Sequence, residues 1–182
     1  EIGCGTGLLT KELQNSNAAV NAIDISPDLL DIAKKRINSK NVKFNLDNAY
    51  DLSFEDESFD TVIGSSILHH LNIKKALLEF YRVLRPGGTI YFTEPNMLNP
   101  IIALQKNIPF IKKFMGDTPD ETAFIKWKII GLLKKHKFKN IEVTSFDFLH
   151  PSLPKFSLPI MIPFTNFLDR FPLISEIAGS LY

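Results

Sequence analysis

The composition of the chain limits the classes of protein to which it can belong. It has 182 residues, of which 45% are hydrophobic, and 21 Lys and Arg against 20 Asp and Glu leave a net charge of +1. This composition suits one globular domain with an apolar core and excludes a disordered segment. The near-neutral charge argues against a nucleic-acid binder, which would show a concentrated basic face. The cationic run Lys134–Lys139 is interpreted as the solvated end of a helix.

The single cysteine, Cys4, restricts the kinds of site that the chain can build. One cysteine forms neither a disulfide framework nor a cysteine-based metal site, so we predict no metal and interpret Cys4 as a small buried residue. The sequence shows no signal peptide and no apolar run of about 18 residues. A cytoplasmic protein is therefore expected.

The chain opens with EIGCGTG, in which glycines occupy three alternate positions. Glycine tolerates positive φ and lets a ligand approach the backbone, so Gly3, Gly5 and Gly7 predict a tight strand-to-helix turn that presents N–H groups. The dinucleotide fingerprint G-x-G-x-x-G would require a glycine in place of Leu8. The loop therefore argues against a nicotinamide dehydrogenase.

Strand-like and helix-like segments alternate after this loop. We predict strands ending at Asp24 and over 41–46, 60–66 and 89–94, and helices over 8–16, 27–39 and 72–84. Ser26 and Pro27 supply the cap and first position of one helix, while Gly87 or Gly88 is expected to end another in the left-handed conformation. This alternation predicts a parallel sheet with helices on both faces.

The second half of the chain breaks this rhythm. Residues 96–118 are an apolar and basic insertion, 119–136 a predicted helix containing Trp127, 140–148 a predicted strand, and 150–176 a hydrophobic C-terminal insertion. Pro159 and Pro163 are expected to prevent a long helix in the last segment, leaving a short amphipathic piece over 164–171.

Candidate functional residues follow the predicted strands, because ligands of open α/β sheets bind beyond the carboxyl ends of the strands. Asp24 ends a strand roughly 20 residues after the glycine loop, where a carboxylate can accept both hydroxyls of a ribose. Its alternative role as a helix cap is already filled by Ser26. The side chains that could act as a general base are His69, His70, Glu94 and His150.

Several motifs together resemble class I S-adenosylmethionine-dependent methyltransferases, in particular the methyltransferase type 11 and quinone-biosynthesis-methyltransferase-like proteins. They are the glycine loop behind the acidic Glu1, the segment DNAYDLSFEDESFD, and the long run FDTVIGSSILHHLNIKKALLEFYRVLRPGGTIYFTEPN, which together cover residues 1–95. The resemblance implies a Rossmann-like α/β fold with a mostly parallel sheet and an antiparallel last strand. Asn48-Ala49 stands where the family usually has Asp-Ala, and Ser53 replaces a proline.

The resemblance implies S-adenosylmethionine as cofactor and assigns roles to its contacts. Gly3 and Ser65 would orient the methionine portion, Asp24 the ribose, and Asn48 with the Ala49 N–H the adenine, with Asp47 as a substitute for Asn48. The full set of expected cofactor-binding residues is Glu1, Gly3, Gly5, Gly7, Asp24, Ile25, Asn48, Ala49 and Ser65. A base is optional for a sulfonium methyl donor; His69, His70 and Glu94 are the candidates.

The expected reaction is in-line transfer of a methyl group to oxygen or carbon of a small or amphiphilic acceptor. The chain lacks a Pro-Pro-aromatic motif after the predicted strand 60–66, and its cysteine lies in the glycine loop, which disfavours amino and cytosine C5 acceptors. A domain that binds the cofactor or a protein partner without turnover is the alternative.

The two insertions are expected to form the acceptor site. Residues 96–118 would form a lid with Lys106, Lys112 and Lys113 in water and its apolar side chains on a lipid-like acceptor; these are Ile101, Ile102, Leu104, Ile108, Phe110 and Ile111. Peripheral membrane contact fits this reading, whereas mutual packing of the insertions or contact with another subunit is the alternative. We expect residues 1–182 to be one methyltransferase domain, truncated in its first strand.

Overall fold

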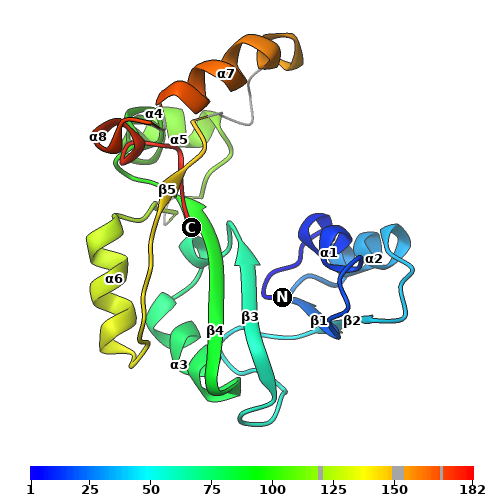
Figure 1. Cartoon of the computed structure of the whole chain (residues 1–182). Helices are drawn as coiled ribbons and strands as arrows, with labels where there is room; N and C mark the ends of the chain where they lie inside the picture. Colours follow the sequence, from blue (N-terminus) through cyan, green and yellow to red (C-terminus); the bar gives the residue numbers. More distant parts are fainter. Residues whose placement is uncertain (119–120, 149–153, 169) are drawn as a thin grey trace. The chain divides into compact units, whose positions relative to one another are not determined.

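The computed structural model describes residues 1–118, 121–148, 154–168 and 170–182. The chain divides into two compact units, Glu1–Phe92 and Thr93–Tyr182 (Figure 1). His150, one of the candidate bases, lies outside the described residues, as do the first residues of the predicted helix 119–136. Among the described residues, no helix is long and apolar enough to cross a membrane.

The first unit alternates strands and helices as predicted. Its strands are β1 (Val20–Asp24), β2 (Val42–Leu46), β3 (Phe59–Ser65) and the first part of β4 (Leu84–Pro95). Its helices are α1 (Leu8–Leu13), α2 (Pro27–Arg36), the 3-10 turn η1 (Leu68–His70) and α3 (Ile73–Val83). β1 and β2 are parallel, with Val20 opposite Val42 and Asp24 opposite Leu46.

The N-terminal residues join β1 to β3. The Ile23 N–H donates to the Glu1 carbonyl at 2.9 Å, and the Cys4 N–H donates to the Ile23 carbonyl at 2.8 Å. On the other side, the Ile2 N–H donates to the Ile63 carbonyl at 2.8 Å. Residues 1–4 therefore occupy a strand position between β1 and β3. This position places the glycine loop at the carboxyl end of β1.

Local sequence signals explain where the helices begin and end. The Ser26 hydroxyl accepts the Leu29 N–H at 3.3 Å, as predicted, and α2 ends at Arg36 because Ile37 is extended. α3 ends at Val83, where Leu84 turns the backbone into β4. Gly87 is left-handed, with φ of +84°, but it lies inside β4, so the expected role of Gly87 or Gly88 as a helix terminator is wrong.

The core of the first unit comes from one face of each helix. α3 buries four apolar side chains at helical spacing, and the Phe80 ring stacks on Phe92 with 5.5 Å between centroids. A second cluster joins β1 to α2 and consists of Cys4, Val20, Ala22 and Leu30. Each fully buried Leu or Phe side chain stabilises the fold by about 1.5–3 kcal/mol. The buried face of α3 therefore stabilises the packing of this helix against β3 and β4.

The second unit is built from short elements around the end of β4. They are α4 (Pro100–Asn107), α5 (Pro109–Phe114), α6 (Lys126–Lys135), β5 (Ser145–Phe146), η2 (Lys155–Ser157), α7 (Leu158–Leu168), α8 (Pro172–Ser175) and β6 (Ser180–Leu181). β6 lies between β4 and β5 and is antiparallel to both, with Leu181 opposite Glu94 and Ser145.

Three sequence predictions fail in this unit. The predicted strand 140–148 keeps only the two residues of β5; Asn140 at its start and Asp147 after β5 have positive φ, which lies outside the extended region. α6 begins at Lys126, later than the predicted helix 119–136. α7 runs through Pro163, so the expectation that Pro159 and Pro163 prevent this helix is wrong. Pro159 is the second helical residue, where an N–H has no intrahelical partner, and only Pro163 removes a bond.

The insertion 96–118 is anchored at its start. Asn96 is fully buried, and its Nδ2 donates to the carbonyls of Glu176 and Ala178 at 2.9 and 2.8 Å. Lys106 is only 6% exposed, and its Nζ lies 3.0 Å from carboxylate oxygens of Asp117 and Glu121. The prediction that Lys106 faces water is therefore wrong, because its ammonium group forms ion pairs with two acidic residues inside the unit.

Candidate functional site

The glycine loop forms the predicted tight turn. Gly3, Gly5 and Gly7 have φ values of +63°, +53° and +78°, which other residues adopt only with strain. A Cβ on Gly3 would lie 2.5 Å from the Ile67 side chain, and one on Gly7 would lie 2.8 Å from Ile37. A Cβ on Gly5 would meet nothing within 4 Å. Gly3 and Gly7 therefore permit packing, whereas Gly5 leaves open space above the loop.

The amide groups of this loop are used differently from the prediction. The Gly5 N–H donates to the Asp24 Oδ2 at 2.8 Å, and the Gly7 N–H donates to the Cys4 carbonyl at 2.8 Å. These two amides thus stabilise the loop itself. The loop offers a ligand the bare backbone surface at Gly5 rather than the N–H groups of Gly5 and Gly7.

Asp24 is the central residue of the candidate site. It ends β1, is 9% exposed, and accepts the N–H groups of Gly5 and Ser26 at 2.8 and 2.9 Å. An ionised carboxylate has about four lone-pair positions, so two remain for hydroxyl donors such as those of a ribose. Ile25 follows it with an apolar side chain that is 72% exposed. The arrangement fits a nucleoside with an intact diol.

The segment after β2 is adjacent to Asp24. The Asp47 N–H donates to the Asp24 carbonyl at 3.1 Å, while the Asp47 carboxylate accepts the backbone N–H groups of Asn48 and Ser53. Asp47 thus holds the loop, which weakens its case as a substitute for Asn48. Asn48 is exposed, and its Oδ1 accepts the Tyr50 N–H at 3.0 Å. Its amide can still reach a ligand beside the partly buried Ala49.

The turn after β3 carries features that the sequence did not signal. Ser65 is exposed at the strand end, and Ser66 has φ of +52°, a conformation that is costly outside glycine and frequent at functional sites. Ile67 packs over Gly3, because a Cβ there would lie 2.5 Å from it. The Tyr50 hydroxyl accepts the Asn72 N–H at 2.8 Å and so connects the segment after β2 to the start of α3.

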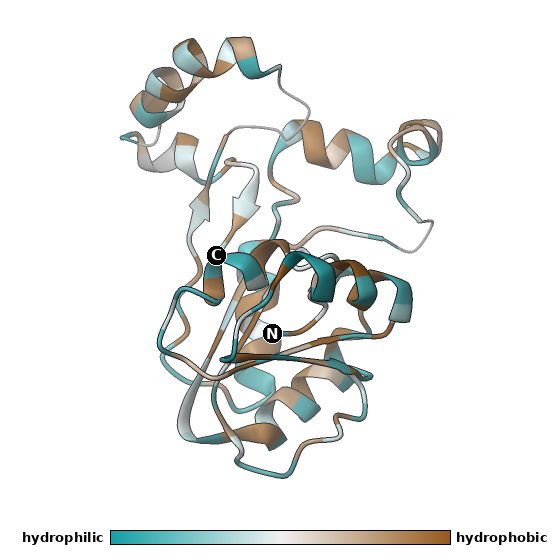
Figure 2. Cartoon of the chain, turned by 90° about the vertical axis from the view of Figure 1, so that its right-hand side faces the viewer, coloured by the Kyte–Doolittle hydropathy of each residue, from teal (hydrophilic) through white to brown (hydrophobic). Residues whose placement is uncertain are grey.

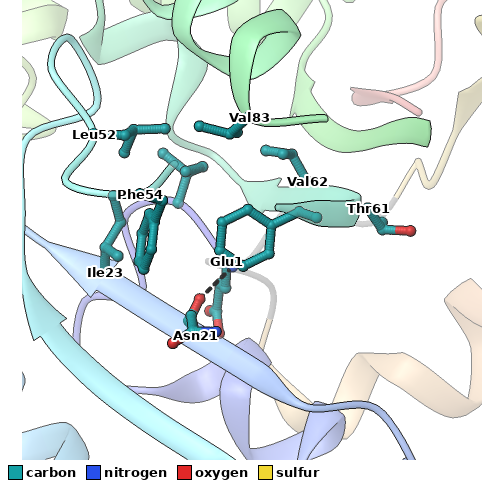
Figure 3. Close-up of a pocket in the computed structure, with 10 residues that line it drawn as sticks. Glu1, Asn21, Ile23, Leu52, Phe54, Thr61, Val62 and Val83 are labelled. Atoms are coloured by element: carbon teal, nitrogen blue, oxygen red, sulfur yellow. Dashed lines mark hydrogen bonds between the residues drawn. The ribbon is translucent and has the colours of Figure 1, made fainter. Parts of the chain in front are cut away.

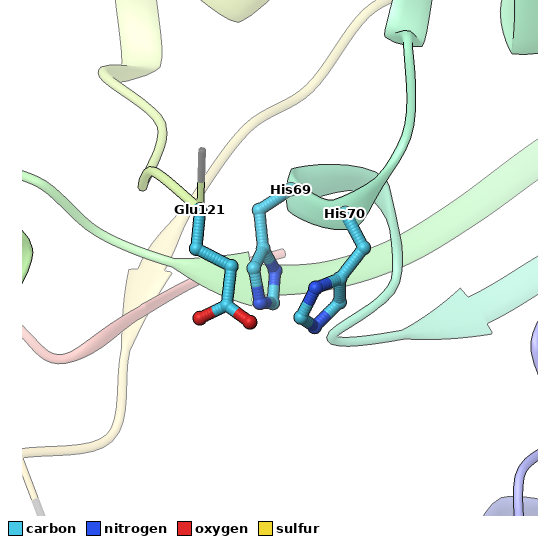
Figure 4. A group of neighbouring side chains, drawn as sticks. All are labelled: His69, His70 and Glu121. Carbon is cyan, nitrogen blue, oxygen red and sulfur yellow. The ribbon is translucent and has the colours of Figure 1, made fainter. Parts of the chain in front are cut away.

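The two histidines lie on η1, in the same unit. Their imidazole centroids are 4.1 Å apart with the ring planes inclined by 39° (Figure 4). His69 is partly buried and His70 is exposed. Glu94 belongs to the second unit, where it is 4% exposed and lies opposite Leu181. The candidate bases therefore come from different units, and only the histidines share one with Asp24.

Glu1 and Cys4 have structural surroundings. The Thr10 hydroxyl donates to the Glu1 carboxylate at 2.6 Å, and burial raises the pKa of that carboxyl despite this hydrogen bond. Burial, followed by the nearby carboxylates of Glu1 and Asp24, raises the pKa of the Cys4 thiol to about 12. Cys4 is therefore a neutral buried side chain. This confirms its interpretation from the sequence as a small buried residue.

A recess in the first unit lies beside Glu1 and is largely apolar (Figure 3). It is lined by Glu1, Ile2, Asn21, Ile23, Leu52, Phe54, Phe59, Thr61, Val62 and Val83. Its lining residues on β1 and β3 precede the ends of those strands, where Asp24 and Ser65 lie; they are Asn21, Ile23, Phe59, Thr61 and Val62. The recess is therefore distinct from the candidate ligand site.

Comparisons with known proteins show the family to which the chain belongs. Residues 1–92 match the family model described as a methyltransferase domain. An uncharacterized protein of Methanocaldococcus jannaschii is 41% identical over 95% of this chain and 66% of its own length. The demethylmenaquinone methyltransferase of Chlorobaculum parvum is 30% identical over 93% of this chain and 63% of its own. The chain thus spans less than two thirds of each of these relatives.

A solved structure gives the same result for the fold. The S-adenosylmethionine-dependent methyltransferase of Thermotoga maritima, named a possible histamine N-methyltransferase, is 25% identical. It superposes with a TM-score of 0.66 and covers 85% of this chain and 69% of its own. This chain belongs to the methyltransferase domain family, and its fold is the Rossmann-like α/β fold of class I S-adenosylmethionine-dependent methyltransferases.

Proposed function

We propose that the chain binds S-adenosylmethionine beyond the ends of β1, β2 and β3 and transfers its methyl group to a small or amphiphilic acceptor. One observation carries the proposal: open space at Gly5 lies directly beside the buried Asp24 carboxylate, to which the Gly5 amide is bound at 2.8 Å. A nucleoside that carries no phosphate suits a loop whose Gly5 and Gly7 amides are already paired.

Each side chain would then have a limited task. Asp24 accepts the ribose hydroxyls, Asn48 with the Ala49 N–H binds the adenine, and Ile25 covers an apolar face of the nucleoside. Gly3 and Ser65 orient the amino acid portion. When bound, the cofactor supplies an activated methyl group, so the protein has to hold the acceptor atom in line and exclude water.

The acceptor is proposed from two sources. Relatives named demethylmenaquinone methyltransferases support a quinone-like, amphiphilic acceptor that is methylated at carbon or oxygen. The exposed apolar side chains of the second unit are compatible with such a molecule. For an acceptor that must lose a proton, His69, His70 and Glu94 are the proposed bases.

A pair of glycine variants tests the cofactor site. Gly5 and Gly87 both have positive φ, and a Cβ at either position would meet nothing within 4 Å. Gly5→Ala and Gly87→Ala should therefore lose similar stability, on the order of 1 kcal/mol, through backbone strain alone. Calorimetric titration with S-adenosylmethionine and S-adenosylhomocysteine should show at least about tenfold weaker binding for Gly5→Ala and unchanged binding for Gly87→Ala.

Equal affinity of the two variants, or preferential binding of NAD, would contradict the assignment of the site. Turnover is measured separately, by mass spectrometry of a soluble demethylmenaquinone analogue incubated with the protein and S-adenosylmethionine. A product heavier by one methylene group supports the quinone-like acceptor. Tight cofactor binding without transfer to any acceptor tested would favour the alternative of a binding domain.

A further inference from the structure

The side chains of α7 have an inverted distribution. The helix Leu158–Leu168 contains no charged residue, and among its residues the structure buries only Thr165, which is 6% exposed. In contrast, Ile160 is 76% exposed, Phe164 51% and Phe167 52%. A surface helix normally turns its apolar stripe inward and its polar residues outward. The outward face of α7 is therefore suited to an apolar environment outside the chain.

α4 and α5 also expose apolar side chains. The structure buries no side chain of either helix. Phe110 and Phe114, one turn apart on α5, are 79% and 81% exposed, and Ile101 and Leu104 on α4 are 60% and 55% exposed. Figure 2 shows hydrophobic stretches on the helices of this unit. Exposed apolar surface of this extent marks an interaction site rather than scattered surface residues.

The charges in these segments indicate the partner. Neither 96–116 nor 154–168 contains Asp or Glu, whereas they contain four lysines. Lys106 is buried in its ion pairs, but Lys113 and Lys155 are exposed. An anionic bilayer complements both properties, because its headgroups attract lysines and its acyl boundary accepts aromatic and aliphatic side chains.

We propose that α4, α5 and α7, the docking helices, bind the second unit to the surface of an anionic lipid bilayer. Phe110, Phe114 and Ile160 would enter the boundary between headgroups and acyl chains, with Lys113 and Lys155 at the phosphates. The helices have 8, 6 and 11 residues, so they would lie in the interface. This binding is independent of methyl transfer and would hold even for a water-soluble acceptor.

Co-sedimentation of the full chain with phosphatidylcholine vesicles, with and without phosphatidylglycerol, tests the proposal. Each lysine near an anionic surface strengthens binding roughly fivefold, so the phosphatidylglycerol vesicles should bind the chain at least about tenfold better. The double variant Phe110→Ser with Phe114→Ser should bind at least about tenfold more weakly. Leu78→Ser is the matched control, because Leu78 is a 63% exposed apolar residue on α3 of the first unit.

A second variant separates lipid binding from misfolding. Lys113→Glu with Lys155→Glu changes only exposed charges, so its thermal melt should match the wild type while binding to the anionic vesicles falls. Unchanged affinity for S-adenosylhomocysteine would keep this result separate from the proposed cofactor site. The proposal is overturned if anionic and neutral vesicles bind equally, if neither variant changes binding, or if the chain self-associates through these helices instead of binding vesicles.

Discussion

The helices of the two units place their apolar side chains differently, although both units bury polar residues. In the first, buried polar residues such as Asp24 and Thr10 tie loops together, and α3 turns its apolar face inward. In the second, α4 and α5 bury no side chain and α7 buries a threonine while exposing its phenylalanines. The contrast lies in the helices: α3 buries an apolar stripe, whereas α4, α5 and α7 leave most of their apolar side chains exposed. The family match to residues 1–92 falls on the first unit.

The ion pairs sharpen the same comparison. In the first unit, Arg82 is 29% exposed; it pairs with Asp56 and Glu79 at 2.8 and 2.7 Å and donates to the carbonyls of Leu52 and Phe54. In the second, Lys106 is 6% exposed between Asp117 and Glu121. Burial acts to raise the pKa of Asp117, but hydrogen bonds from Lys106 and Gln105 hold it below its ordinary value.

The largest expected effect comes from Lys106→Met. The variant removes the cation that lies 3.0 Å from the carboxylates of Asp117 and Glu121, and breaking a buried ion pair should cost about 3–5 kcal/mol of unfolding free energy. Trp127 is the only tryptophan and lies in the second unit, and Cys4 is the only cysteine and lies in the first. Urea unfolding followed by Trp127 fluorescence should shift strongly, with little change in the protection of Cys4 from labelling. A parallel loss of Cys4 protection would contradict this expectation, because it would show that the two units unfold together.

A smaller, pH-dependent effect is expected for Glu79→Gln. The hydrogen bond from Arg82 holds the pKa of Glu79 below its ordinary value, although partial burial opposes this. A lowered pKa stabilises the fold above the ordinary value near 4.3, and this contribution is lost as the pH falls through the folded-state pKa. Wild type and variant should therefore differ by about 1–2 kcal/mol at pH 7 and converge in acid.

The control for this measurement is Asp60→Asn. Asp60 pairs with Arg85 at 2.7 Å, but the two side chains are 83% and 52% exposed, so the pair should contribute little at any pH. Urea melts of both variants between pH 3 and pH 7 provide the comparison. A constant difference for Glu79→Gln across this range would show that its effect comes from packing rather than charge.

At neutral pH, the smallest effect on stability concerns Cys4. Its thiol has a pKa of about 12, against an ordinary value near 8.5, so at pH 8 the native thiolate should be roughly a thousandfold rarer than in the unfolded chain. A raised pKa means that the associated stability is present below pH 8.5 and is lost as the pH rises toward 12. Labelling with a disulfide reagent at pH 8 should be slow until urea opens the first unit. Rapid labelling of the native protein would contradict the burial.

Sequence patterns predicted the elements that depend on neighbouring residues. Ser26 and Pro27 start α2 because a cap and a fixed φ act within one turn, and the positions of β2 and β3 follow from short β-branched and apolar runs. The positive φ of all three loop glycines was likewise expected from their spacing. These signals are local, so a single sequence carries them.

Features that depend on distant partners could not be predicted in this way. Lys106 is buried because it pairs with Asp117 and Glu121. The spacing of these residues in the sequence does not predict this pairing. The Asp24 carboxylate takes the Gly5 amide, 19 residues away, which changes what the loop offers a ligand. α7 also keeps its helix through Pro163 against its local propensity. The first two features depend on contacts between residues that are far apart in the sequence.

The hydrogen bond from the Asn72 N–H to the Tyr50 hydroxyl has a thermodynamic consequence. It joins the segment that follows β2 to the residue that caps α3, two positions after His70. A ligand that immobilises Tyr50 therefore removes conformational entropy from the start of α3 as well. Linkage is reciprocal, so a molecule that orders the histidine turn lowers the entropic cost of filling the segment near Asn48 by the same free energy.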